Sequence, residues 1–441
     1  MSNMSTSSKK EVLKNLLKAI HSGVDPSELK AKFRDILASI SPLEIPLVEQ
    51  ELVKEGVPVG DILKLCDLHV ELFREFLASR ELKDLPRGHP LDLLMRENEW
   101  ILRQAEALGV YAQALVNAKN EEEARHYVES IKIVLGELRK IRLHYRKVQM
   151  LVFPYLERRG IIAIPRVLWG REDQVLVKLR HVIQELGQLS ENPPRDTLVE
   201  FTSRLLELVK EISELVFREN KILYPAVYAL FTEGEWAAIG EVASEMGYIV
   251  ETRGSEWKPS AKPIYPYEVE AVVTSDQLEK LPPEFKATLE HSGLQPDIYK
   301  VKREGDIELE TGFLTPEEIE GIFKSLPIEV TYADINDRVR FFSESDITGG
   351  FVRTKTILGR RIPFCHPPRL ENYVMLNVEA VKKGQYKHRE FWTRLGDRVI
   401  RVIIAPVKGR DGKILGVLEI VEDLTDVVNN PEEVKKKIMV L

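Results

Sequence analysis

The sequence is poor in cysteine, and this limits how the fold can be held together. Its 441 residues include only two cysteines, Cys66 and Cys365. Two thiols cannot build a disulfide framework, and such scarcity is typical of proteins that fold in a reducing compartment. The first ten residues are polar and serine-rich, without the apolar stretch of a secretory signal. We therefore expect a cytoplasmic protein.

Long apolar runs and an excess of basic charge are also missing. No stretch approaches the roughly 20 apolar residues that a membrane helix requires, so we expect no membrane span. The formal net charge is −7, whereas a protein that binds nucleic acid usually presents a basic face. We therefore expect no nucleic-acid partner.

Signatures of common catalytic machinery are absent as well. The sequence contains no nucleophile elbow, no glycine-rich phosphate loop and no kinase motif. It also lacks a recognisable kinase or DNA-binding output module, so a signal would pass through a protein partner or a homodimer. Enzymatic activity stays open, and a non-enzymatic role is favoured.

The pattern of helices and strands divides the chain into four parts. At ~150 residues for each domain, the length predicts about three domains. We expect a multidomain α and α+β protein with a helical domain at 9–80, an up-down four-helix bundle at 81–231, a connector at 232–310 and a smaller α+β domain at 311–430. The last domain combines an antiparallel sheet with helices.

The bundle is predicted from four long stretches with helical periodicity. These stretches cover residues 91–118, 121–159, 171–191 and 195–231, and they are joined by short breaks that contain asparagine, glycine or proline. Such bundles place ligands on the inward faces of their helices.

A short motif occurs twice in the bundle, each time around an aromatic residue followed by proline. When Phe153-Pro154 is aligned with Tyr224-Pro225, His144 falls opposite Leu215 and Glu219 falls opposite Val148. Residues four apart lie on one face of a helix, so a His and a Glu at this spacing can point at one metal ion. Each copy retains only one of the two, which predicts a degenerate site.

The C-terminal domain is predicted from a change of period. Strand-like runs occur at 328–334, 339–343, 389–395, 399–407 and 414–421, with a helix at 370–382. Asp411-Gly412 marks a hairpin between the last two strands. A second helix, at 315–325, begins with the capping sequence Thr315-Pro316-Glu317-Glu318.

Three groups of residues resemble known domains in a known order. Residues 64–69 and the helices before them resemble a domain of unknown function that precedes hemerythrin-like domains. Gly88-His89-Pro90, His144-Tyr145 and the segments 153–157 and 219–225 resemble the hemerythrin-like HHE cation-binding bundle. Residues 326–334, 365–368, 390–392 and 416–419 resemble a PAS sensor domain.

The resemblance implies a bundle able to hold a carboxylate-bridged di-iron centre, and it nominates ligands. The residues that match are His89, His144, Glu172 and Glu219, with Asp92, Glu97 and Asp173 as further carboxylates. The family pattern places a Glu near Gln149 and a His near both Glu172 and Arg218, and this sequence has none of the three. Arg218 beside Glu219 could act as an ion-pair partner instead. We therefore favour a metal-free centre over one or two bound iron ions.

The PAS resemblance implies a pocket for a small ligand, a gas or haem. Cys365, His366 and Trp392 are the candidates to line it, because thiolate and imidazole ligate haem and one of Phe391 and Trp392 must face inward. We favour structural roles for Cys365 and His366 over haem binding.

Three functions remain under consideration on sequence grounds. The favoured one is a sensory or regulatory protein that responds to a small molecule or gas. The first alternative is a di-iron or mono-metal protein that handles oxygen or iron with oxidative activity. The second is a metal-free interaction scaffold.

Overall fold

The computed structural model describes residues 15, 19, 82, 85–190, 193–252, 257–269, 296–349 and 351–439. The chain forms two compact units, residues 1–300 and 301–441. The helical domain predicted at 9–80 lies almost wholly outside the described residues. None of the described helices has the length and apolar character needed to cross a membrane.

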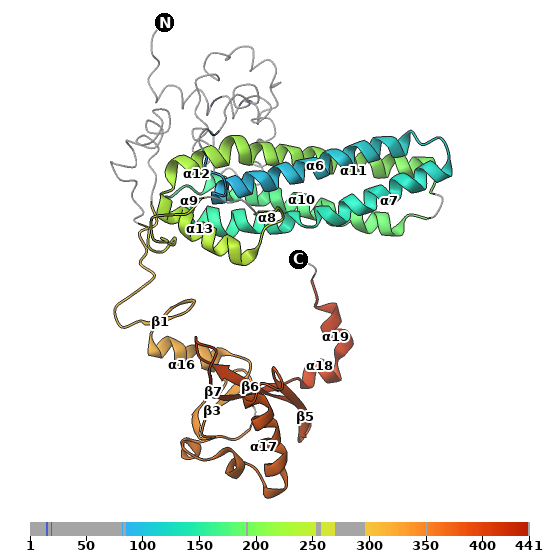
Figure 1. Ribbon diagram of the computed structural model, residues 1–441. Coiled ribbons are helices and arrows are strands. Elements are labelled where there is room, and N and C mark those ends of the chain that lie inside the picture. Colours follow the sequence, from blue (N-terminus) through green and yellow to red (C-terminus); the bar gives the residue numbers. More distant parts are fainter. Residues whose placement is uncertain are drawn as a thin grey trace. The chain divides into compact units, whose positions relative to one another are not determined.

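Four long helical segments form the bundle in the first unit (Figure 1). Two of them are interrupted, each by a π-helical turn. The elements are α6 (Pro90–Val116), α7 (Glu121–Leu138), α8 (Ile141–Lys147), η1 (Val148–Val152), α9 (Phe153–Arg158), α10 (Ala163–Gln188), α11 (Arg195–Arg218), η2 (Glu219–Leu223) and α12 (Tyr224–Leu230). The up-down bundle predicted from the sequence is confirmed.

The two π-turns explain why the aromatic-proline motif is repeated. In each copy the aromatic residue donates its N–H five residues back, from Phe153 to Val148 and from Tyr224 to Glu219. The following proline has no N–H, and its ring would clash with the carbonyl four residues earlier in a regular helix. Widening the turn relieves this clash, so the π-turn is the local consequence of Pro154 and Pro225.

Two helices differ from the sequence prediction. Helix α10 begins at Ala163 rather than near 171, because Pro165 falls in its first turn, where the missing N–H is not needed. Helix α13 (Glu233–Met246) occupies a segment predicted as connector. It starts with a capping box between Thr232 and Glu235, a signal that the sequence carries.

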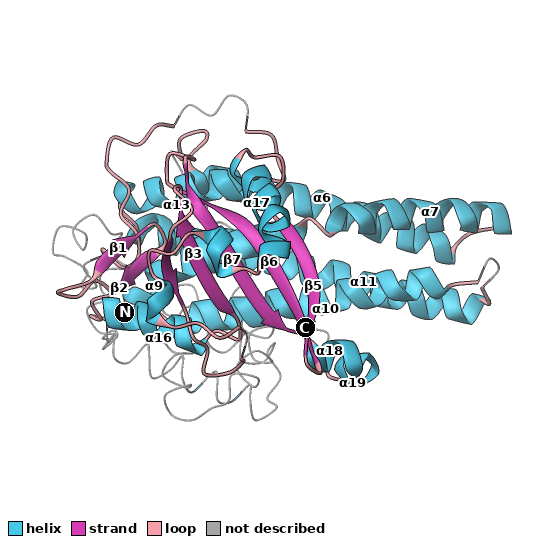
Figure 2. Ribbon diagram, turned by 90° about the horizontal axis from the view of Figure 1, so that it is seen from below, coloured by secondary structure: helices cyan, strands magenta, loops and turns pink. Residues whose placement is uncertain are grey.

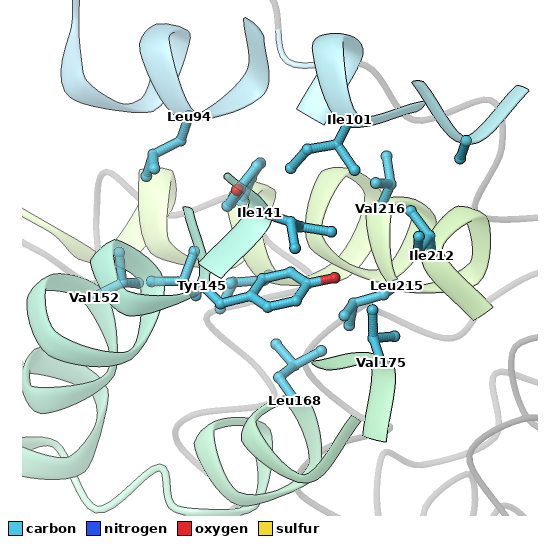
Figure 3. Packing of buried hydrophobic residues seen from close by; sticks show 14 of the residues in the cluster. Leu94, Ile101, Ile141, Tyr145, Val152, Leu168, Val175, Ile212, Leu215 and Val216 are labelled. Atoms are coloured by element: carbon cyan, nitrogen blue, oxygen red, sulfur yellow. The ribbon is translucent and has the colours of Figure 1, made fainter. Parts of the chain in front are cut away.

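The bundle core is a single apolar cluster drawn from all four helical segments. Figure 3 shows part of it, in which the ring of Tyr145 lies between Ile141, Leu168 and Leu215. Leu215 is the residue that stands opposite His144 in the repeat. It is buried in this cluster and contributes apolar packing.

The second unit contains a five-stranded antiparallel sheet in the order β4-β3-β7-β6-β5 (Figure 2). Helix α17 (Pro368–Lys382) packs on one face, over Ala333, Ile404 and Val417. The strands are β3 (Glu329–Asp334), β4 (Val339–Phe342), β5 (Arg389–Leu395), β6 (Arg398–Lys408) and β7 (Ile414–Asp423). The predicted α+β fold is confirmed, and the Asp411-Gly412 hairpin joins β6 to β7.

Smaller elements complete this unit. Helix α16 (Pro316–Ser325) begins with the expected capping box at Thr315 and Glu318. The hairpin of β1 (Ile307–Leu309) and β2 (Gly312–Leu314) was not predicted, because its strands are too short to show a period. The remaining elements are η3 (Lys355–Ile357), η4 (Ile362–Cys365), α18 (Thr425–Asn429) and α19 (Pro431–Lys436).

We predict that Gly416→Ala destabilises the sheet by about 1–3 kcal/mol, the usual cost of overpacking. A Cβ at Gly416 would overlap the carbonyl oxygen of Ala333 on the neighbouring strand. The matched control is Gly321→Ala in α16, where a Cβ meets nothing within 4 Å and helix propensity rises by about 0.5–1 kcal/mol. Hydrogen exchange of the β3 and β7 amides measures both effects. Equal protection in the two variants would contradict the prediction.

Candidate functional site

The two incomplete copies of the repeated motif meet at the centre of the bundle. Nε2 of His144, from α8, lies 2.9 Å from Oε2 of Glu219, the first residue of η2. Both side chains are buried, with exposures of 0% and 1%. The fold therefore joins the His of one copy to the Glu of the other.

The second ring nitrogen of His144 is engaged by another carboxylate. Nδ1 lies 2.7 Å from Oε2 of Glu97, a fully buried residue of α6. The other oxygen of Glu97 accepts hydrogen bonds from Lys147 and from the backbone N–H of Ile249, the latter at 3.0 Å. Lys147 was not anticipated, although it follows His144 by three residues and so shares its helix face.

The charges around His144 favour its protonated form. Burial lowers the pKa of His144, but the carboxylates of Glu219 and Glu97 outweigh burial and raise it to about 9. Burial raises the pKa of Glu97, yet His144 and Lys147 together bring it below its usual value. The two carboxylates therefore favour the imidazolium form of His144, which donates a hydrogen bond to a carboxylate on each side.

Two polar side chains complete the environment of Glu219. Its Oε2 accepts from Nδ2 of Asn98 at 2.8 Å and from the hydroxyl of Tyr224 at 3.0 Å, besides facing His144. Tyr224 is the aromatic residue of the second motif, and burial together with Glu219 raises its pKa well above the usual range. The motif thus supplies both a carboxylate and a donor that stabilises it.

Glu172 shares no hydrogen bond with His144 or Glu219, although its charge interacts with both. This buried residue of α10 accepts a hydrogen bond from Nε2 of Gln149 at 2.6 Å. Burial and the negative charge of Glu219 raise the pKa of Glu172 well above its usual value. Its Oε1, the Oε1 of Glu219 and the hydroxyl of Tyr145 are buried without a hydrogen-bond partner among the described residues.

His89, the remaining predicted metal ligand, is at the end of the bundle. It caps α6, with Nδ1 accepting from the N–H of Leu91 at 3.1 Å. Its ring contacts Trp236 and Trp257 at centroid distances of 4.8 and 4.7 Å. Eight residues of helix, about 12 Å, separate it from Glu97. Asp92 likewise caps the helix start by accepting from the N–H of Gly88.

The network also holds the chain that leaves the bundle after α13. The ammonium of Lys147 donates to the carbonyl of Gly247 at 2.9 Å and lies 4.5 Å from the ring centroid of Tyr248. The N–H of Ile249 donates to Glu97. The segment Gly247–Ile249 is thereby fixed to the same carboxylate that binds His144.

The donor set does not fit a di-iron centre. In the protonated form that Glu97 and Glu219 favour, both ring nitrogens of His144 carry a hydrogen, so neither has a lone pair for a metal. Glu97 is neutralised by Lys147, and His89 is distant. Among the described residues, no three His, Cys, Asp or Glu side chains are grouped so that they could hold a metal ion. The unpartnered oxygens of Glu172 and Glu219 are the remaining acceptors.

In the second unit, Arg353 binds three polar side chains on the face of the sheet that α17 covers. Arg353 donates to Glu329 at 2.8 Å and to Glu419 at 2.9 Å, and its Nε donates to the hydroxyl of Thr331 at 2.7 Å. The Arg353 side chain is 7% exposed. Register pairs Thr331 with Glu419 and Glu419 with Ile404, so these side chains share the face of the small apolar core.

The predicted PAS-pocket residues are not grouped around that arginine. Cys365 is exposed at the end of η4, where Sγ contacts the carbonyl of Arg361. Nδ1 of His366 lies 2.9 Å from the carbonyl oxygen of Ile362. Trp392 is 51% exposed and pairs with Arg401 on the opposite face of the sheet, whereas its neighbour Phe391 packs against the core.

Three family models match the chain in the order expected from the sequence. Residues 13–79 match a family of unknown function (DUF438), residues 89–227 match the hemerythrin HHE cation binding domain, and residues 319–425 match a PAS domain. The bundle is therefore a hemerythrin-like domain and the C-terminal sheet is a PAS domain. This combination supports a sensory or regulatory protein.

Solved structures are similar to parts of the chain. The crystal structure of a C-terminal domain from Streptococcus mutans shares 26% identity over 29% of this chain and 98% of that chain, with a TM-score of 0.27. The PAS domain of a protein from Colwellia psychrerythraea shares 16% identity over 25% of this chain and 97% of that one, with a TM-score of 0.21. No curated protein matches the chain.

Removing one charge from the buried network should be costly. Lys147→Met leaves Glu97 without its ammonium partner and should destabilise the bundle by about 3–5 kcal/mol. Adding Glu97→Gln removes the stranded charge and should restore part of that loss. Urea unfolding followed by far-UV circular dichroism measures both. A double variant no more stable than Lys147→Met would show that the two side chains are not coupled.

The stability of the bundle should also depend on pH through His144. Because its folded pKa of about 9 exceeds the unfolded value of 6.5, its contribution is complete below pH 6.5 and is lost as the pH rises through about 9. Glu97, Glu219, Lys147 and Tyr224 surround the ring, so His144→Gln is the comparison that isolates its share. Urea midpoints across this range should fall more steeply in the parent protein than in His144→Gln. Parallel curves would contradict the prediction.

Proposed function

We propose that this chain is a cytoplasmic sensory or regulatory protein without catalytic activity, in which an ion-pair network takes the place of iron in the hemerythrin-like bundle. The observation that carries the proposal is His144, whose two ring nitrogens face Glu97 and Glu219 at 2.7 and 2.9 Å. The cytoplasmic location rests on the scarcity of cysteine and on the exposed free thiol of Cys365.

Charge balance supports a centre that is stable without a metal. Two buried carboxylates in one place repel each other and are normally held by a cation. Here His144 lies between the carboxylates, and Lys147 lies on the far side of Glu97. The positive charge that a bound metal would supply therefore comes from His144 and Lys147.

The contacts of Lys147 and Glu97 supply the route by which the bundle acts on the rest of the chain. They hold the carbonyl of Gly247 and the N–H of Ile249, which follow α13 and precede the PAS domain in sequence. A change in the network, such as the loss of one ion pair, would release this segment. In this proposal the bundle centre sets whether the segment Gly247–Ile249 is held or free.

The PAS domain is the proposed ligand-sensing part. Buried Arg353 with Glu329 and Glu419 supplies a charged group on the covered face of the sheet. A small polar ligand would bind there by competing for one of these charged side chains. The resulting signal would pass to a protein partner or through a homodimer. Cys365 and His366 remain secondary candidates for this role.

A second function is favoured by one observation. The Oε1 atoms of Glu172 and Glu219 are buried without a hydrogen-bond partner among the described residues, and carboxylate oxygens bind iron, manganese and zinc. The alternative is thus a bundle that holds a single ion between these two carboxylates and handles iron or oxygen.

Metal analysis separates the two functions. The full-length protein is incubated without oxygen with Fe(II), Mn(II) or Zn(II), desalted and analysed for metal, beside Glu172→Gln. The regulatory proposal predicts far less than one ion per chain in both proteins. About one ion per chain, lost in Glu172→Gln, would instead establish the single-ion alternative.

Hydrogen exchange tests the coupling to the segment after α13. Lys147→Met should raise exchange at Tyr248 and Ile249, because both the carbonyl of Gly247 and the carboxylate of Glu97 lose a partner. Lys178→Met is the matched control, since Lys178 also bridges two glutamates, Glu207 and Glu211, at the surface of α10 and α11. Unchanged exchange in Lys147→Met, or an equal rise in the control, would overturn the coupling.

A further inference from the structure

A large cavity opens between helices near the end of the bundle where α6 is followed by α7 and α10 by α11. Its volume is about 1110 Å³, slightly above the range of ~300–1,000 Å³ for small-molecule sites. It is lined by the end of α6, by α7, by the last turns of α10 and by the start of α11. These helix ends lie together in the bundle in Figures 1 and 2.

Glycines in two helices keep this cavity open. Gly136 of α7 and Gly187 of α10 line it, and a Cβ built on either residue meets nothing within 4 Å. Glycine lowers helix stability at interior positions, so helix formation does not account for either residue. Leucines and an isoleucine form the floor: Leu115, Leu135, Ile183, Leu186 and Leu198.

The rim of the cavity is basic, although the chain as a whole carries a net charge of −7. The lining includes five cations and only two acids, Glu121 and Glu129; the cations are Lys119, Arg125, Lys132, Arg139 and Arg195. Both acids are paired, with Arg125 and with Lys132. Arg139 and Arg195 form no ion pair with the part of the chain that the structure describes.

We infer that this cavity binds a single-chain amphiphile with an anionic headgroup, a long-chain carboxylate such as a fatty acid. The apolar floor receives the chain, and burial of its methylene groups provides the binding energy. Arg139 and Arg195 supply two guanidinium groups that have no ion-pair partner among the described residues, and such groups recognise carboxylate or phosphate by paired hydrogen bonds. The inference is independent of the proposed regulatory function, because the site shares no residue with the His144 network.

Titration with a fluorescent polyene fatty acid tests the inference in the full-length protein. Fluorescence should rise saturably, and dodecanoate should displace the probe better than dodecanol or dodecyltrimethylammonium. Dodecyl phosphate and inorganic phosphate distinguish an amphiphile from a free anion, since only the former should compete. Competition by dodecanol equal to that of dodecanoate, or displacement by inorganic phosphate, would overturn the assignment.

Variants locate the binding within the molecule. Gly136→Leu with Gly187→Leu fills the cavity with better helix formers and should weaken binding by about ten-fold or more, because the apolar chain loses its buried surface. Arg139→Gln with Arg195→Gln should weaken binding of dodecanoate but not of dodecanol. The control Gly321→Leu, at an equally open helical glycine, should leave affinity unchanged. Undiminished binding in both double variants, or no binding by the parent protein, would refute the site.

Discussion

The bridge that His144 makes between Glu97 and Glu219 is the interaction on which the bundle centre depends. It joins three helical segments, because the carboxylates come from α6 and η2 and the imidazole from α8. A buried carboxylate without a partner is strongly destabilising, so each of these groups requires the others. Lys147 extends the bridge to the backbone after α13, which ties the exit from the bundle to its centre.

The repeated motif acquires a precise role in this arrangement. Pro154 and Pro225 each cause a π-turn, and the second turn begins at Glu219 itself. That turn places Glu219 and Tyr224, five residues apart, within 3.0 Å of each other. The second π-turn thus positions two groups of the buried polar centre, whereas the first begins at the apolar residue Val148.

Much of the fold follows from the sequence because its signals are local. The helical period predicted the bundle, and the capping box of Thr315 and Glu318 predicted the start of α16. The pair Asp411-Gly412 predicted the last hairpin. The site was harder to predict. His144 and Glu219 were predicted as site residues from their motif, and they are in contact. His89 was predicted as a ligand from its position in the sequence, but it caps a helix. Lys147 and Arg353 were missed. The sequence alone does not distinguish a charged residue at the surface from one that is buried against a carboxylate, because the carboxylate comes from a helix or strand that is distant in the sequence.

Nitrogen NMR of the imidazole side chains, with His144→Gln to assign the signal, examines the bridge most directly. In the full-length protein near neutral pH, His144 should show protons on both ring nitrogens, each shifted by a hydrogen bond to a carboxylate. A ring with one unprotonated nitrogen, or one whose signal moves on addition of Fe(II) or Zn(II), would contradict the bridge and restore His144 as a metal ligand.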